Sequence, residues 1–431
     1  MNIESIITHF QRMNGLEGTG MDYPVMLTIY LGVFLLSFIA NVCLYVSDHG
    51  NRVVWLVDQH KVIKSKFSYM AMLACTFTGV YLVGSFPTEL QNTFGTWNAD
   101  LFYTLGQTTI MITAGIYSLA TYKKRSSVIL NSLSIVVGLS TSIPMAATTI
   151  LLPLNIDCEL IRISSILAII ITFIVLAALS VKFNLLVKYS RINIYMFLIT
   201  TITLFTTIST LGNESIDTSK ILPFQGMINN EPWKELLTNP YWWYFEATVV
   251  SWSIFCGRFV AYCSNGYSVK NIIKYGTISL IILTSMWHLV SAATGYTLSF
   301  SRGWMIYTLT AFTMLGFAVT SLDSASKTLL NDLIRIFANR KLNLKPNLFL
   351  VVIMGIIGLI NIIILYTGSS KLFTIIFCLV FIPYLVKAIV YSIKFAIGKV
   401  DYNKSGTITK NEYVKICNKE PDGEDCRRFD E

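Results

Sequence analysis

Charged residues, histidines and closely spaced cysteines are scarce in this chain of 431 residues. Asp, Glu, Lys and Arg together make up 13% of the sequence, and there are only four His. The eight Cys show no CxxC or Cys/His spacing of the kind that holds a metal ion. No glycine-rich nucleotide-binding loop and no catalytic-triad spacing occurs. Most kinds of enzyme depend on such groups, so we expect a protein that is not an enzyme and needs no cofactor.

Apolar residues are correspondingly abundant. The composition is 54% hydrophobic and the mean hydropathy is +0.59, which is too apolar for a soluble protein of this length. In a soluble chain, the formal net charge of +9 would suggest nucleic acid as a binding partner. Here basic cytoplasmic loops explain the charge better, so we expect membrane lipid as a partner and no nucleic acid.

Long apolar runs recur along the chain. About eleven of them reach the roughly 20 residues that a helix needs to cross a bilayer, near 25–46, 67–86, 101–121, 129–152, 161–181, 192–211, 242–263, 275–296, 303–325, 347–367 and 372–393. The sequence therefore predicts an all-α polytopic membrane protein. Its expected parts are an extracytoplasmic segment over 1–24, a transmembrane domain over 25–395 and a tail over 396–431.

Basic residues distinguish the two sides of the predicted domain. One set of loops carries clusters of Lys and Arg, namely Arg52, Lys61, Lys64 and Lys66; Lys123, Lys124 and Arg125; Lys182, Lys188 and Arg191; Lys270 and Lys274; and Lys327, Arg335, Arg340, Lys341 and Lys345. The opposite set carries only Arg12, Lys220, Lys234, Arg302 and Lys371. Because Lys and Arg accumulate in cytoplasmic loops, we expect a multi-pass protein of the plasma or inner membrane. Its N-terminus lies outside and its tail is cytoplasmic.

The stretch 239–270 reads NPYWWYFEATVVSWSIFCGRFVAYCSNGYSVK and resembles the working helix of a transporter. Aromatic residues at 241–245 suit a membrane interface. Glu246 and Arg258 then fall inside an apolar span, where charges usually face the bundle interior or a water-filled cavity. For Arg258 we favour a satisfied structural role. Glu246 is either a hydrated carboxylate near the outer interface or a group that attracts a cation.

Two motifs in this chain resemble the betaine/choline/carnitine transporter family. The first is similar to that family's eighth helix and comprises Ser251-Trp252-Ser253-x-Phe255-x-Gly257-x-Phe259-x-Ala261 and Ser264-x-Gly266-x-Ser268. The second resembles its tenth helix and comprises Val319-Thr320-Ser321-Leu322-Asp323-Ser324-Ala325-Ser326. The resemblance spans roughly residues 25–395. It implies an inverted-repeat bundle of the leucine-transporter type that lacks the family's first helix, with repeats starting near 67 and 242.

The resemblance also implies a sodium site. In the family, residues matching Thr320 and Ser321 contribute hydroxyl ligands, and carbonyl groups of an unwound facing helix complete the site; here Leu73 and Thr76 fall opposite. The alternative is that these hydroxyls only hydrogen-bond to their own helix. The facing helix reads Cys-Thr-Phe-Thr-Gly at 75–79 and keeps one of the family's several glycines there.

The residues implied for solute binding depart from the family's aromatic cage, which holds quaternary ammonium groups by cation–π attraction. Positions that carry Trp in the family read Glu246, Thr248, Val249, Thr109 and Ala114 in this chain. The residual solute-binding set is Trp252, Tyr117, Glu246 and Tyr81. Glu246 would replace the attraction of the lost rings by direct charge attraction to a cation.

The tail contains a separate motif at 401–412, DYNKSGTITKNE. It fits the twelve-residue EF-hand loop, with a glycine at position 6 and oxygen ligands from Asp401, Asn403, Ser405, Thr407, Thr409 and Glu412. The motif occurs once and has only two acidic ligands. Calcium binding and a plain polar turn are therefore both retained as interpretations.

We take a secondary active transporter as the leading interpretation. It would move a small cationic or zwitterionic organic solute, of the betaine or choline type, by alternating access, with sodium as the candidate coupling ion. The alternative is a non-transporting membrane sensor or regulator on the same fold. Homo-oligomer formation is left open by the sequence.

Overall fold

A computed structural model describes residues 23–56, 62–84, 97–151, 158–179, 183–211, 241–294, 304–336 and 380–419. Within these ranges the chain forms eleven α-helices and one two-stranded sheet, so the all-α prediction is confirmed. The helices are α2 (Tyr23–Val46), α3 (Lys66–Gly84), α5 (Trp97–Thr121), α6 (Arg125–Leu151), α7 (Glu159–Leu179), α8 (Phe183–Leu211), α11 (Tyr241–Cys263), α12 (Val269–Thr294), α13 (Trp304–Ile336), α16 (Ile382–Ala396) and α17 (Lys410–Lys419).

Ten of the predicted apolar runs contain or overlap one of these helices, because an apolar run of this length satisfies its backbone groups best within one helix. The runs near 25–46 and 242–263 match α2 and α11 within two residues. The run at 347–367 and the segment 1–22 lie outside the described residues.

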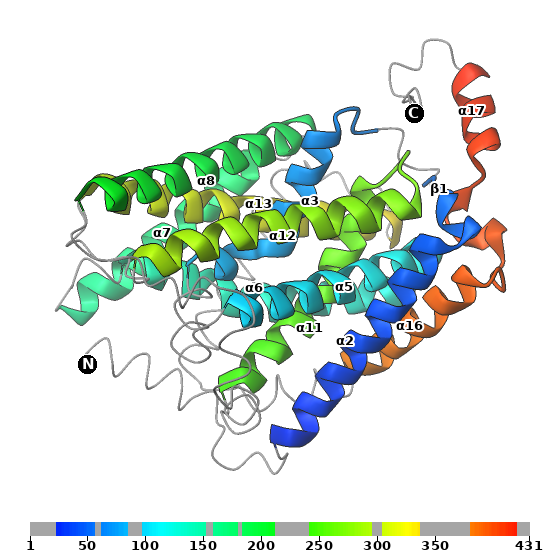
Figure 1. Cartoon of the computed structure of the whole chain (residues 1–431), viewed down its shortest axis with the longest axis horizontal. Helices are drawn as coiled ribbons and strands as arrows, with labels where there is room; N and C mark the ends of the chain where they lie inside the picture. The colour runs from blue at the N-terminus through cyan, green and yellow to red at the C-terminus, as the bar shows by residue number, and fades with distance from the viewer. Residues whose placement is uncertain are drawn as a thin grey trace.

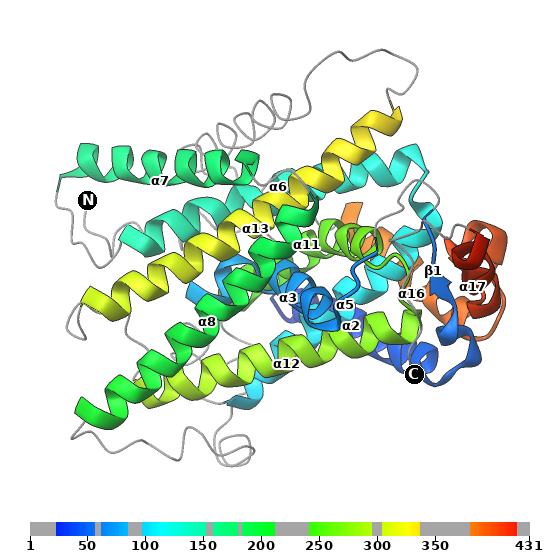
Figure 2. The same ribbon diagram turned by 90° about the horizontal axis from the view of Figure 1, so that it is seen from above.

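The helices form one elongated bundle. Figure 1 shows α8, α12 and α13 along one side of it, and α2 and α16 next to each other on the other side. Seen from above in Figure 2, α17 and the strand β1 (Val53–Val54) lie together at one end of the bundle. The tail is therefore placed against the bundle end.

Helix contacts follow a paired pattern. α11 packs on α5 and α6, while α3 packs on α12 and α13. α5 also packs on α12 and on α16, and α8 packs on α12 and α13. These contacts match if α3 corresponds to α11, α5 to α12 and α6 to α13. Under this exchange, the contacts of α11 with α5 and α6 become those of α3 with α12 and α13.

The side of α2 that faces the bundle carries small polar side chains, and its outer side carries large apolar ones. In α2, Ser37 and Asn41 are buried, while Leu36 and Ile39 are 49% and 51% exposed. Asn41 Nδ2 donates to the Thr109 carbonyl oxygen of α5 at 3.0 Å. The polar face of α2 is thus used for contact between helices.

One stretch among the described residues, Asn184–Leu204 in α8, is long and apolar enough to cross a membrane by length and composition. Two shorter apolar stretches are Tyr30–Val46 in α2 and Ile163–Ala177 in α7. In α8 the buried Ser190, Thr200 and Thr201 contrast with Ile199 and Ile202, which are 49% and 58% exposed.

The bundle end is closed by a small sheet. β2 (Thr407–Ile408) pairs antiparallel with β1, and Val53 also bridges to Ser268 in the turn between α11 and α12. That turn requires Gly266, whose φ of +79° is costly for other residues.

Candidate functional site

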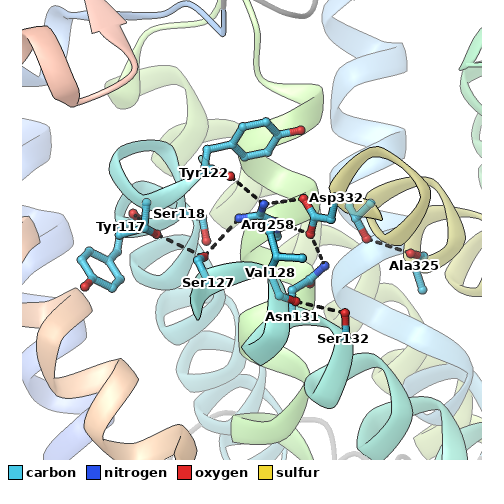
Figure 3. Close-up of polar contacts among 12 residues, drawn as sticks. Tyr117, Ser118, Tyr122, Ser127, Val128, Asn131, Ser132, Arg258, Ala325 and Asp332 are labelled. Carbon is cyan, nitrogen blue, oxygen red and sulfur yellow. Dashed lines mark hydrogen bonds and ion pairs between the residues drawn. The ribbon is translucent and has the colours of Figure 1, made fainter. Parts of the chain in front are cut away.

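A buried ion pair lies near the same end of the bundle. Figure 3 shows the guanidinium of Arg258, from α11, facing the carboxylate of Asp332, from α13. Arg258 Nε donates to Asp332 Oδ2 at 2.6 Å, and a second bond joins Arg258 Nη2 to Asp332 Oδ1. Both side chains are 1% exposed. The pair is a two-pronged contact of the kind that holds two buried charges stably together.

The other N–H groups of Arg258 donate to residues in the turn between α5 and α6 and at the beginning of α6. Nη2 donates to the Tyr122 carbonyl oxygen at 2.8 Å, and Nη1 donates to Ser127 Oγ at 3.1 Å. The guanidinium carbon lies 4.5 Å from the centroid of the Tyr122 ring. Asn131 Nδ2 of α6 donates to Asp332 Oδ2 at 2.9 Å. Arg258 is therefore satisfied, as expected, and it joins α5, α6, α11 and α13.

The residues predicted for sodium lie on helices that touch. Thr320 and Ser321 are buried on α13, and Leu73 and Thr76 are buried on the neighbouring α3. Thr320 Oγ1 donates to the Gly316 and Phe317 carbonyl oxygens at 2.9 and 3.0 Å, which matches the alternative interpretation for that hydroxyl. Ser321 Oγ is buried without a hydrogen-bond partner.

The facing helix differs from an unwound one. α3 is an α-helix throughout 66–84, so the carbonyl groups of Leu73 and Thr76 lie within a continuous helix. Thr76 Oγ1 donates to the Met72 carbonyl oxygen at 2.8 Å. The stretch 75–79 has a single glycine, which explains the continuity, because unwinding needs residues that tolerate unusual backbone angles. Sodium binding at these four residues stays a prediction.

The two residual aromatic residues contact different neighbours. Trp252 Nε1 donates to the Gly138 carbonyl oxygen of α6 at 3.1 Å, and the ring packs on Phe255 at 5.1 Å between centroids. Tyr117 packs instead on Tyr384 of α16 at 5.1 Å. Trp252 thus contacts α6, whereas Tyr117 contacts α16. Their joint role in solute binding stays a prediction.

The other two solute-binding candidates are placed only by their backbones. Glu246 lies in the second turn of α11, and Tyr81 lies in the last turn of α3. Their side chains lie outside what the structure describes.

α5 and α11 lie very close together at one position of the expected cage. A Cβ at Gly257 would lie 2.5 Å from the Gly115 nitrogen and 2.7 Å from the Ala114 carbonyl carbon. Backbones this close leave no space for a large ring at 114, where the family carries Trp. Small residues at such crossings are typical of helix pairs in membranes.

The loop at 401–412 has the backbone of an EF-hand turn at its centre. Gly406 adopts a φ of +67°, as expected for position 6. Ser405 and Thr407 are buried, with 2.7 Å between their hydroxyl oxygens, whereas the other four predicted ligands are exposed. Asp401 Oδ1 accepts from the Asn403 N–H at 3.1 Å, and Asp401 Oδ2 lies 3.3 Å from Lys404 Nζ.

Glu412 lies in the first turn of the helix that follows, α17. Its Oε2 accepts from the Thr409 N–H and from the Thr409 hydroxyl, each at 2.8 Å, and Thr409 Oγ1 accepts from the Glu412 N–H at 3.2 Å. This reciprocal pattern is a capping box at the start of α17. The hydrogen bonds from Thr409 lower the pKa of Glu412 below its ordinary value of 4.5.

No protein-family model matches this chain, and no curated protein matches it. The resemblance to the betaine/choline/carnitine transporters rests on the two motifs quoted above.

Two polar residues of this region were not singled out from the sequence. Asp332 lies beyond the apolar run predicted to end at 325, and Asn193 lies at the beginning of the run at 192–211. Asn193 Oδ1 is buried without a partner, and Asn193 Nδ2 lies 3.7 Å from Cys75 Sγ of α3. For Asn193 the available signal was an amide inside a predicted span, whereas Asp332 lay outside every predicted span and gave no such signal. Across the described ranges, no three or more His, Cys, Asp and Glu side chains gather as a metal site.

Proposed function

We propose that this chain is a polytopic membrane protein whose helices cross the bilayer. The support is the direction in which side chains point. In α2 and α8, buried polar side chains such as Asn41 and Thr200 bond to other helices, while large apolar side chains such as Leu36 and Ile202 face outward. Water would favour the reverse arrangement, whereas lipid solvates apolar side chains and leaves polar groups to pair between helices.

The described helices are proposed to belong to two inverted repeats. The support is the exchange pattern of helix contacts: α3 lies against α12 and α13 as α11 lies against α5 and α6. The pairs α5·α12 and α6·α13 map onto themselves under the same exchange. A two-fold axis in the membrane plane produces such pairs, and solute sites of inverted-repeat transporters lie near that axis.

The function that fits best is secondary active transport of a small cationic or zwitterionic organic solute. The exchange pattern of helix contacts is the observation that carries this proposal, because two matching halves that pack on each other suit alternating access. Glu246, in the second turn of α11, would attract the cationic group of the solute. We place the N-terminus outside and the tail in the cytoplasm.

Solute uptake into vesicles tests the proposal. Purified protein in liposomes should take up a radiolabelled betaine- or choline-type solute above the level of empty liposomes. Glu246→Gln should reduce uptake, because it removes the attracting charge. Uptake equal to that of empty liposomes across such a panel, by protein that stays folded, would contradict transport.

Sodium is the proposed coupling ion. Thr320 and Ser321 supply hydroxyl oxygens on α13, and Ala at these positions supplies none. Thr320→Ala combined with Ser321→Ala should weaken the sodium dependence of solute binding and preserve the fold. An unchanged sodium response in the double variant would show that the hydroxyls serve packing.

A non-transporting sensor on the same fold is the second candidate. The contact of Gly257 with Ala114 and Gly115 favours it, because it closes one wall of the expected cage. A sensor should bind solute, as measured by thermal shift in detergent, and give no flux in liposomes. Binding accompanied by flux excludes this candidate.

A further inference from the structure

The loop at 401–412 is docked on the bundle through its strand. Ile408 of β2 pairs with Val53 of β1, and the Trp55 N–H donates to the Gly406 carbonyl oxygen at 2.9 Å. Tyr413, in the helix after the loop, is fully buried and packs edge-to-face on Trp55 at 5.4 Å. The single hand thus has a strand partner, which belongs to the segment between α2 and α3.

β1 is in turn held by the turn between α11 and α12. The Val54 N–H donates to the Tyr267 carbonyl oxygen, and the Gly266 N–H donates to the Val54 carbonyl oxygen, each at 2.9 Å. The Arg52 carbonyl oxygen accepts from the Val269 N–H at 3.0 Å, in the first turn of α12. Backbone hydrogen bonds therefore run from the loop through β1 to α12.

A cationic side chain already contacts the loop. Arg52 Nη2 donates to the Thr407 carbonyl oxygen at 3.1 Å, and Arg52 Nε donates to Thr407 Oγ1 at 3.1 Å. The guanidinium carbon lies 4.0 Å from the centroid of the Tyr402 ring. Thr407 is position 7 of the loop, and the backbone carbonyl of position 7 is a calcium ligand in EF-hands. Arg52 thus contacts the atom that a metal ion would need.

We propose that residues 401–412 form a calcium site that is completed within the same chain, with β1 as its strand partner and Arg52 as the resident cation that calcium displaces. Strand pairing through Ile408 is compatible with a metal at the Thr407 carbonyl oxygen, because neighbouring residues of a strand direct their carbonyl groups to opposite sides. Calcium binding therefore releases the Arg52 side chain, while β1 and β2 stay paired. The site is independent of whether the bundle transports a solute.

Displacing Arg52 lowers the affinity for calcium. The ion must replace two charge-assisted hydrogen bonds and a cation–π contact, and each tenfold in affinity corresponds to about 1.4 kcal/mol. Removing the competing guanidinium should strengthen calcium binding by about tenfold or more. Lys404 also lies beside Asp401, but both are exposed, so this pair competes weakly.

The test is a calorimetric titration of the full-length protein in detergent with calcium chloride. Arg52→Gln is the test variant, and Glu412→Gln removes a proposed ligand. Lys399→Gln is the control, since Lys399 is an exposed cation of the same tail. Hydrogen exchange at Val53 and Ile408 reports in parallel whether the two strands stay paired.

The expected result is tighter calcium binding in Arg52→Gln, unchanged binding in Lys399→Gln and weaker binding in Glu412→Gln, with Val53 and Ile408 protected in all four proteins. Equal affinity of wild type and Arg52→Gln contradicts the competition, as does an equal gain in Lys399→Gln. No calcium heat at millimolar concentration in Arg52→Gln with paired strands contradicts the site. If Arg52→Gln loses strand protection, Arg52→Met is used, because it keeps a long side chain without the charge, and affinity no higher than wild type there counts against the proposal.

Discussion

At the scale of single residues, the most informative side chains are those whose partners define their role. Glu412 was expected to be a calcium ligand, and in this structure it caps α17 through Thr409. Both roles use the side-chain oxygens of Glu412 at the end of the loop. The capping role of Glu412 can therefore be tested in the absence of calcium.

Glu412 makes the beginning of α17 sensitive to acid. Because hydrogen bonds from Thr409 lower its pKa in the folded state, its stabilising contribution is present above the ordinary value of 4.5. It is lost as the pH falls through the lowered pKa. Relative to their intrinsic rates, hydrogen exchange of the Thr409 and Glu412 amides should stay slow down to about pH 4.5 and accelerate below it.

Glu412→Gln is the matched control for this pH dependence, because glutamine also serves in a capping box and does not titrate. Protection in this variant should not change over the same pH range. An identical acid response in wild type and variant would show that another group is responsible.

At the scale of elements, the bundle depends on contacts between helices that are distant in sequence. α5 and α11 approach at Gly257 and Ala114, and α11 and α13 are joined by Arg258 and Asp332. The first contact needs the absence of a side chain, and the second needs two charges together. Each can be broken by one substitution.

Gly257→Ala should destabilise the protein. The new Cβ would lie 2.5 Å from the backbone nitrogen of Gly115, so the helices must separate. We expect the free energy of unfolding to fall by about 1–3 kcal/mol, as for other overpacked cores. Thermal unfolding in detergent measures the change.

Gly32→Ala in α2 is the control, because its Cβ would meet no other part of the chain within 4 Å. It should leave the free energy of unfolding unchanged or raise it by up to about 1 kcal/mol, since alanine favours helix. Equal losses in both variants would mean that helix crossing is not the cause.

Arg258→Ala should lower the free energy of unfolding by about 3–5 kcal/mol, because it leaves the Asp332 carboxylate buried without its counter-charge. Combining Arg258→Met with Asp332→Leu should cost less than the sum of the two single changes. Arg125→Ala removes an exposed cation of the same turn and should stay within about 0.5 kcal/mol. If the double variant loses as much free energy of unfolding as the two single variants together, Arg258 and Asp332 are not a coupled pair.

At the scale of the whole molecule, the turns at 122–127 and 264–268 lie at one end of the bundle. Arg258, five residues before Cys263 ends α11, binds the Tyr122 carbonyl oxygen. A Cβ at Gly406 in the tail would lie 2.9 Å from the Leu119 carbonyl oxygen, and Gly406 also binds Trp55 beside the second turn. One face of the membrane should therefore contain both turns and the tail.

Labelling of single cysteines from outside the cell tests this placement. In a background without the native Cys, Lys124→Cys and Lys270→Cys should resist an impermeant maleimide in intact cells and react after permeabilisation. Met305→Cys, which is exposed at the opposite end of α13, should react in intact cells. Labelling of Lys124→Cys or Lys270→Cys in intact cells would overturn the orientation.

The positions of α2 and α11 were determined by the sequence alone, because the apolar runs near 25–46 and 242–263 are long enough to satisfy their backbones only as helices. The ends of other helices were not: α13 continues eleven residues beyond its predicted end at 325. The turn at Gly406 was also determined locally, since its positive φ requires glycine. Tertiary structure alone decided the partners. Arg258 meets Asp332 across 74 residues, and Arg52 meets Thr407 across 355. No local pattern specifies such contacts, because they depend on how whole helices pack and where the tail docks.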